Sequence, residues 1–202
     1  MKLKVRFAPI WLLSASFLMA ALIAGCSSGT TRRDIEGVPG GFAYRGDRTA
    51  YPELYRRASE QLTANEFSAA EATFRAIIAK EPDYVDGYIG LGTSLLLQDQ
   101  LVQAQQAYEQ AIGIRPDSVE ALIGMGSVHY RNGVYEKASG FYRSALVLEG
   151  TNPDALWGLA ISLAALGQVD GAIANLERIR ELAPGTALAQ DAANLISTLK
   201  GN

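Results

Sequence analysis

From residue 51 onward, the apolar and polar positions of this chain repeat every 34 residues. Each register of the repeat holds one kind of side chain in all four copies. An alanine register consists of Ala70, Ala104, Ala138 and Ala172, and a bulky apolar register of Phe74, Tyr108, Tyr142 and Leu176. A third register holds the small residues Ala58, Gly92, Gly126 and Ala160. The pattern predicts four copies of one structural unit, over residues 51–84, 85–118, 119–152 and 153–186.

Turn-forming residues divide each unit into two predicted helices. At the centre of the units stand Asn65, Asp99, Gly133 and Gly167. A proline, which cannot continue a helix, follows the second helix at Pro82, Pro116 and Pro184. In the third unit Gly150 holds this slot, and Asn152 followed by Pro153 predicts an N-cap and a first helical residue there.

A unit of this length and pattern resembles the tetratricopeptide repeat. The second copy matches best, with the eight signature positions filled by Tyr88, Leu91, Gly92, Leu95, Ala104, Tyr108, Ala111 and Pro116. The resemblance covers residues 51–184. It implies an all-α fold, a tetratricopeptide superhelix (an α-solenoid) of four helix-turn-helix repeats that winds right-handed and has a concave inner face.

The two ends of the predicted domain, residues 51–202, differ from its middle. The first copy has Arg57 and Gln61 where the family places core residues, which suits the solvent-facing helix of a terminal repeat. After the fourth copy, residues 187–200 form a further amphipathic segment. Its apolar face consists of Leu188, Ala192, Leu195, Ile196 and Leu199. We expect a capping helix here, and nine helices in total.

The resemblance also implies which side chains line the concave face, because the family uses fixed places on each first helix for this purpose. The candidate protein-binding residues are Tyr55, Leu62, Ile89, Thr93, Leu96, Ile123, Ser127, Tyr130, Trp157 and Ile161. This set is apolar or hydroxyl-bearing and lacks the Lys and Asn side chains that clamp a C-terminal carboxylate. It suits an amphipathic helix or an extended apolar peptide, anchored by its aromatic residues. The alternative for Ile89 and Ile123 is packing between adjacent first helices.

The N-terminus has the pattern of a secretory signal. A basic start with Lys2, Lys4 and Arg6 precedes an apolar run and the small residues before Cys26, so residues 1–25 are predicted to be cleaved. The sequence around Cys26 resembles the bacterial lipobox, which implies lipidation of this cysteine with fatty acids such as palmitate. Ser27 at the next position implies sorting to the outer membrane. The alternatives are an uncleaved membrane-spanning helix and a buried thiol.

Residues 26–50 connect the predicted anchor to the repeats. This segment is rich in glycine and shows neither a helical nor a strand period. We expect it to be a flexible tether that lets the domain sit away from the membrane and reach a partner.

The composition of the chain argues against several classes of function. The 202-residue chain has a formal net charge of −3, and loss of Lys2, Lys4 and Arg6 with the signal leaves 15 basic against 21 acidic residues, a charge of −6. Nucleic acid is therefore not an expected partner. Cys26 is the only cysteine and His129 the only histidine, so no disulfide framework, metal site, cofactor or catalytic residue is predicted. His129 is expected to be a partly buried structural residue, and the protein is not expected to be an enzyme.

A lipobox, a short tether and four repeats together resemble the tetratricopeptide lipoproteins of tight-adherence (Tad/Flp) pilus loci. That resemblance implies a pilotin-like scaffold on the outer membrane, facing the periplasm, with a secretin or another pilus or envelope assembly component as partner. The alternative is a scaffold for exopolysaccharide export or outer-membrane protein assembly, with an enzyme as the remote third choice.

Overall fold

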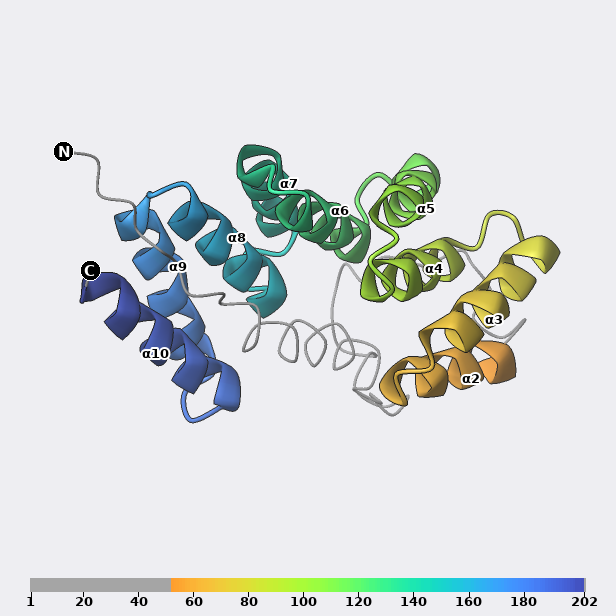
Figure 1. The fold of residues 1–202 in the computed structure, drawn as a ribbon, viewed down its shortest axis with the longest axis horizontal. Coiled ribbons are helices and arrows are strands. Elements are labelled where there is room, and N and C mark those ends of the chain that lie inside the picture. Colours follow the sequence, from red (N-terminus) through yellow and green to blue (C-terminus); the bar gives the residue numbers. More distant parts are fainter. Residues whose placement is uncertain (1–51, 202) are drawn as a thin grey trace, which may run out of the picture. The chain divides into compact units, whose positions relative to one another are not determined.

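The computed structural model describes residues 52–201, which form nine α-helices and no strand (Figure 1). The helices are α2 (Pro52–Thr63), α3 (Phe67–Lys80), α4 (Val85–Leu97), α5 (Leu101–Ile114), α6 (Val119–Arg131), α7 (Tyr135–Leu148), α8 (Pro153–Ala165), α9 (Val169–Leu182) and α10 (Ala187–Lys200). The predicted all-α repeat fold is confirmed. The predictions for the signal, Cys26 and the tether lie outside the described residues. No helix within residues 52–201 is both long and apolar enough to cross a membrane.

The central turn of each repeat depends on one residue with a left-handed backbone. Asn65, Asp99, Gly133 and Gly167 have φ angles of 61°, 62°, 74° and 75°. Glycine, asparagine and aspartate adopt this conformation at the lowest cost, which explains why only these residue types occur in the register. The turn register predicted from the sequence is thus confirmed in all four repeats.

Side-chain caps start three of the later helices. The side chains of Ser118, Asn152 and Thr186 accept hydrogen bonds from the backbone N–H groups of Ala121, Ala155 and Ala189, at 3.3, 3.0 and 3.2 Å. Pro153 occupies the first turn of α8. These caps satisfy N–H groups that have no partner inside the helix and fix where each first helix begins.

The helices form two layers, and the chain passes from one layer to the other with each helix from α2 to α10 (Figure 1). Consecutive helices pack against each other throughout, and the first helices of neighbouring repeats also meet, in the pairs α2–α4, α4–α6 and α6–α8. The second helices α3, α5, α7 and α9 make at most marginal contact with one another. The first helices are therefore the more closely spaced layer. The side of α2, α4, α6, α8 and α10 that faces away from the second helices is called the inner surface below.

Each second helix places one large side chain between two small residues of the first helices. Tyr108 lies between Gly92 of its own repeat and Gly124 of the next, and Tyr142 lies in the same way between Gly126 and Gly158. A Cβ atom on Gly124 would lie 2.3 Å from the Tyr108 ring. Glycine at these places is what lets an aromatic ring enter the space between two first helices.

The same register shows what happens when the large residue is smaller. In the fourth repeat Leu176 replaces the tyrosine, and Ala160 and Ala192 stand in the two small positions, all three buried in one core. In the first repeat Phe74 lies beside Gly90 of the next repeat, whereas Ala58 stands in the small position of its own repeat. The position in the following repeat is therefore the one matched in size, with glycine beside each ring and alanine beside Leu176.

The two ends of the array are built as expected from the sequence. Helix α2 buries only Ala58 and Leu62, and Arg57 is exposed. At the other end α10 buries Ala192 and Ile196 against α8 and α9, and Ala189 is also buried. The polar helix α2 and the amphipathic helix α10 thus cover the two ends of the hydrophobic core. The inner repeats cover their parts of the core by packing against their neighbours.

Candidate protein-binding surface

The ten residues predicted to bind a partner all lie on the first helices, but they differ in burial. Half-buried side chains that reach the surface are Tyr55, Ile89, Tyr130, Trp157 and Ile161. Buried side chains, between 2% and 6% exposed, are Leu62, Thr93, Leu96, Ile123 and Ser127. The second group presents little area to a partner. For Ile123 the structure shows packing in the core around Tyr142, whereas Ile89 is half-buried.

Two of the buried residues are held by tyrosine hydroxyl groups. Thr93 Oγ1 lies 3.1 Å from Tyr108 Oη, and Ser127 Oγ lies 3.0 Å from Tyr142 Oη. Ser127 donates its own proton to the Ile123 carbonyl at 3.0 Å, so Tyr142 is the donor to Ser127. Burial raises the pKa of Tyr142, which keeps the phenol protonated. These hydroxyl groups tie the two layers together.

This pairing of a hydroxyl group with a tyrosine is visible in the residue pattern, although it was not among the predictions. In the ninth place of the first helix, a hydroxyl residue stands fifteen positions before a tyrosine in the second and third repeats. In the fourth repeat the corresponding residues are Ile161 and Leu176, which need no polar partner, and Ile161 is half-buried at the surface. In the middle of the array the hydroxyl groups of Thr93 and Ser127 are thus hydrogen-bonded within the protein. On α8 the corresponding position is the apolar Ile161.

The three aromatic candidates are each braced by a neighbour. The Tyr55 ring meets Phe74 edge to face, with 5.9 Å between centroids, and Tyr130 lies 5.4 Å from Tyr135. Burial, and secondarily Tyr135, raises the pKa of Tyr130. Trp157 packs against the core shared by α8, α9 and α10. Braced aromatic side chains lose little conformational freedom when a partner covers them, which is the property of good interface anchors.

The inner helices also carry acidic residues, which were not among the predicted binding residues. The second place of the first helices holds Asp86, Glu120 and Asp154. Asp86 is paired with Arg115 at 3.3 Å. Burial and the neighbouring Glu149 raise the pKa of Asp154. On α10, Asp191 stands 34 residues after Trp157, and its Oδ2 atom is buried with no hydrogen-bond partner.

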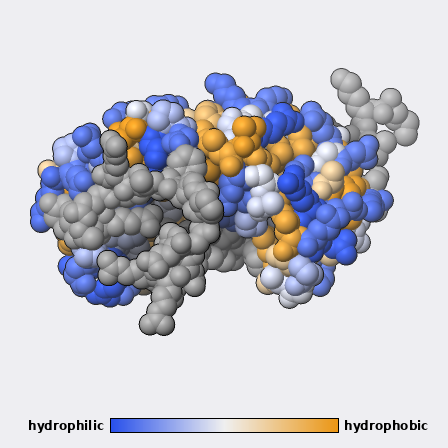
Figure 2. All heavy atoms as spheres, turned by 180° about the vertical axis from the view of Figure 1, so that it is seen from behind, coloured by the Kyte–Doolittle hydropathy of each residue, from blue (hydrophilic) through white to orange (hydrophobic). Residues whose placement is uncertain are grey.

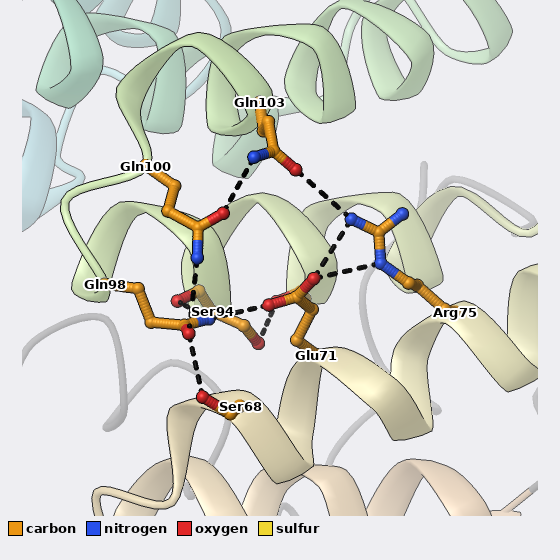
Figure 3. Close-up of polar contacts among 8 residues, drawn as sticks. Ser68, Glu71, Arg75, Ser94, Gln98, Gln100 and Gln103 are labelled. Atoms are coloured by element: carbon orange, nitrogen blue, oxygen red, sulfur yellow. Dashed lines mark hydrogen bonds and ion pairs between the residues drawn. The ribbon is translucent and has the colours of Figure 1, made fainter.

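A polar network joins α3 to the end of α4 and to α5 in the first two repeats (Figure 3). The amide of Gln98 at the end of α4 accepts from Ser68 Oγ at 2.9 Å and donates to Glu71 at 2.8 Å, both on α3. Glu71 also binds Arg75 at 3.0 Å, and Arg75 reaches Gln103 on α5 at 3.5 Å. These contacts link α3 to the second repeat.

Comparison with known proteins identifies the repeat. The sequence profile described as "Tetratricopeptide repeat" matches residues 55–118, 98–153 and 124–187, which together span most of the described chain. This chain belongs to the tetratricopeptide repeat family. No curated protein sequence matches it.

Solved structures share the fold of this tetratricopeptide repeat protein. A thermophilic tetratricopeptide protein of Thermus thermophilus, TTC0263, is 23% identical, with a TM-score of 0.66 over 77% of this chain and 86% of the other. The MamA protein is 20% identical, with a TM-score of 0.59 over 73% and 81%. The first tetratricopeptide domain of Spaghetti (RPAP3), solved with the HSP90 peptide SRMEEVD, is 19% identical, with a TM-score of 0.54 over 58% and 94%. At these identities the likeness shows the fold.

His129 has a packing role in the tetratricopeptide stack. It is 9% exposed and stacks on Phe141, with ring centroids 5.3 Å apart and planes 11° from parallel. Burial, and then Lys137, lowers the pKa of His129, so the neutral ring is favoured. Within residues 52–201 no group of three or more His, Cys, Asp or Glu side chains is arranged to hold a metal ion. The residues around His129 therefore account for its position by packing alone.

Proposed function

We propose that this tetratricopeptide repeat protein is a scaffold that holds a protein partner on its inner surface while a lipid on Cys26 anchors it to the outer membrane, facing the periplasm. Proteins of this family generally act as non-catalytic interaction scaffolds. The observation that carries the proposal is the row of braced, half-buried aromatic residues on the inner helices, namely Tyr55, Tyr130 and Trp157. Such residues supply most of the binding energy in protein interfaces.

The place of action is supported by the N-terminal sequence. A basic start, an apolar run and Ala24-Gly25 before Cys26 fit a lipoprotein signal, and the glycine-rich residues 27–50 fit a tether. A chain of charge −6 after removal of the signal gains nothing from anionic headgroups, so the acyl chains must supply the membrane affinity.

The machine that we propose for it is a Tad/type IV-like pilus secretion system. The combination of lipobox, tether and four repeats resembles the Tad/Flp pilus assembly lipoprotein TadD. In that role the partner is the secretin or a neighbouring assembly component, presented as an amphipathic helix or an extended apolar peptide. A gene neighbourhood with a secretin, an assembly ATPase and a prepilin peptidase would support this assignment.

An acidic residue on the inner surface tests the proposal. We expect Ile161→Glu to weaken capture of the envelope partner at least about tenfold and to impair pilus assembly, because a carboxylate would be desolvated under the bound partner. Val147→Glu is the matched control, since Val147 lies on the second helix α7 and is 84% exposed. Both variants should melt within a few degrees of the parent protein. Normal assembly with Ile161→Glu and impaired assembly with Val147→Glu would contradict the proposal and indicate a binding site on the second helices.

A further inference from the structure

We infer that the part of the inner surface formed by α8 and α10 receives a basic amphipathic segment of the partner, with a lysine or arginine side chain against Asp154 and Asp191 and apolar side chains against Trp157 and Ile161. This inference rests on the proposed function and specifies the chemistry of the partner. It departs from the carboxylate-clamping use of the fold, which needs basic residues on the inner helices.

The acidic side chains have no cation of their own in the described structure. Asp154 is half-buried beside Glu149, and neither residue forms an ion pair within residues 52–201. The Oδ2 atom of Asp191 is buried without a hydrogen-bond donor. A buried carboxylate oxygen without a donor is unfavourable. Because the Asp191 side chain is half-buried, it can turn toward an incoming ammonium or guanidinium group, which would supply the missing hydrogen bonds.

On helices α6, α8 and α10 the Lys and Arg side chains are either absent or already paired. Helix α8 contains no Lys, Arg or His. On α6, Arg131 donates to the Leu96 carbonyl at 2.7 Å and pairs with Asp99 at 3.0 Å. On α10, Lys200 lies 3.7 Å from Glu177 of α9. The charge of this surface is therefore complementary to a cationic segment and opposed to an acidic one.

The apolar half of the site adjoins these carboxylates. Asp154, Trp157 and Ile161 stand at i, i+3 and i+7 on α8, a spacing that places them on one face of the helix. On α10, Asp191 stands between Leu188 and Leu195, and both leucines pack against the core that Trp157 also contacts. An amphipathic helix with basic residues along the edge of its apolar face would present complementary groups to this surface. The face of an indole ring additionally attracts a cation placed over it.

The chain offers a direct optical probe of this site. It contains two tryptophans, so the full-length chain with Trp11→Phe has Trp157 as its only tryptophan. In zwitterionic detergent we would titrate this protein with a synthetic amphipathic helix of leucine and lysine, and with matched helices that carry glutamine or glutamate instead of lysine. We expect a shift in Trp157 emission, with the lysine helix bound at least about tenfold more tightly than the glutamine helix.

Neutral substitutions then identify the carboxylates. In Asp154→Asn with Asp191→Asn, affinity for the lysine helix should fall at least about tenfold and affinity for the glutamine helix should stay within about twofold. The double variant should melt at or above the temperature of the parent, because an unpaired buried carboxylate is removed. Asp170→Asn, an exposed aspartate in the first turn of α9, is the control and should change neither affinity.

The outcomes separate this inference from the proposed function. Equal binding of the lysine and glutamine helices, tighter binding of the glutamate helix, or no effect of the double variant overturns the basic partner. Self-association of the chain that displaces the lysine helix would also overturn it, in favour of a second copy. If the charge of the helix has no effect but Ile161→Glu still abolishes partner capture, the proposed scaffold function stands. Only the inference of a basic partner segment is then wrong.

Discussion

Gly124→Ala is expected to lower the free energy of unfolding by about 3 kcal/mol, the upper part of the range for overpacked cores. The added methyl carbon would lie 2.3 Å from the Tyr108 ring. That ring cannot move aside easily, because it is only 1% exposed, is enclosed by Gly92 on its other side, and has its hydroxyl group 3.1 Å from Thr93. For a domain of this size the change corresponds to a fall in melting temperature of about 6–12 °C.

Two comparisons show whether the ring contact is the cause. Gly140→Ala on α7 introduces the same methyl group where no atom lies within 4 Å, and it should stabilise the protein by up to about 1 kcal/mol through helix propensity. In a Tyr108→Leu background, Gly124→Ala should cost much less than in the parent, since the fourth repeat already pairs Leu176 with two alanines. Thermal and urea unfolding followed by circular dichroism would be measured for the parent and the four variants. Equal effects of Gly124→Ala in both backgrounds would contradict the size matching.

Cys26→Ser is expected to abolish lipid attachment and to leave the precursor uncleaved by the lipoprotein signal peptidase. Serine has no thiol, so it cannot form the thioether bond that carries the diacylglycerol, and cleavage by the lipoprotein signal peptidase follows that lipidation. Metabolic labelling with an alkyne fatty acid, followed by gel analysis, measures both effects. We expect complete loss of label and a larger apparent mass in the variant.

Ser27→Ala is the matched control for this position, because it alters the neighbouring residue and keeps the thiol. It should be labelled like the parent protein. Equal labelling of Cys26→Ser and the parent would remove the lipoprotein anchor from the account and leave the repeat domain unaffected.

Much of the fold could be predicted because the repeat makes each position visible four times. A left-handed residue is needed at every central turn, so Asn65, Asp99, Gly133 and Gly167 stood out in the sequence and all have positive φ. The cap at Asn152 was evident in the same way, because asparagine followed by proline suits a helix start. Local backbone requirements of this kind leave a direct trace in residue type.

The packing between repeats was harder to predict. The small register containing Gly92 and Gly126 was recognised, but the second register with Gly90, Gly124 and Gly158 was not. Those glycines lie against a ring from the preceding repeat, at 2.2–2.3 Å for an added Cβ. These glycines also recur every 34 residues, but each ring lies sixteen residues from a small residue on either side, so the sequence alone does not show that one ring packs against both.

The candidate surface was predicted at the level of helices and only partly at the level of side chains. The fifth place holds the buried Ile123 and the half-buried Trp157, and the ninth place holds the buried Thr93 and Ser127 and the half-buried Ile161. At the ninth place the difference follows from the second helices, because Tyr108 and Tyr142 reach Thr93 and Ser127 with their hydroxyl groups, whereas Leu176 has none. Figure 2 shows hydrophobic side chains emerging between hydrophilic ones on one face of the molecule, so exposed apolar area alone does not locate a binding site.

Site-specific photo-crosslinking in intact cells tests the central claim most directly, namely that the inner surface holds the partner. A benzophenone amino acid would be placed at Trp157 or Tyr130 on the inner helices, and at Val102 on α5, which is 73% exposed, as the control. The account predicts that irradiation gives one common adduct from Trp157 and Tyr130, containing an envelope assembly component, and none from Val102. An adduct formed from Val102 but from neither inner position would contradict it.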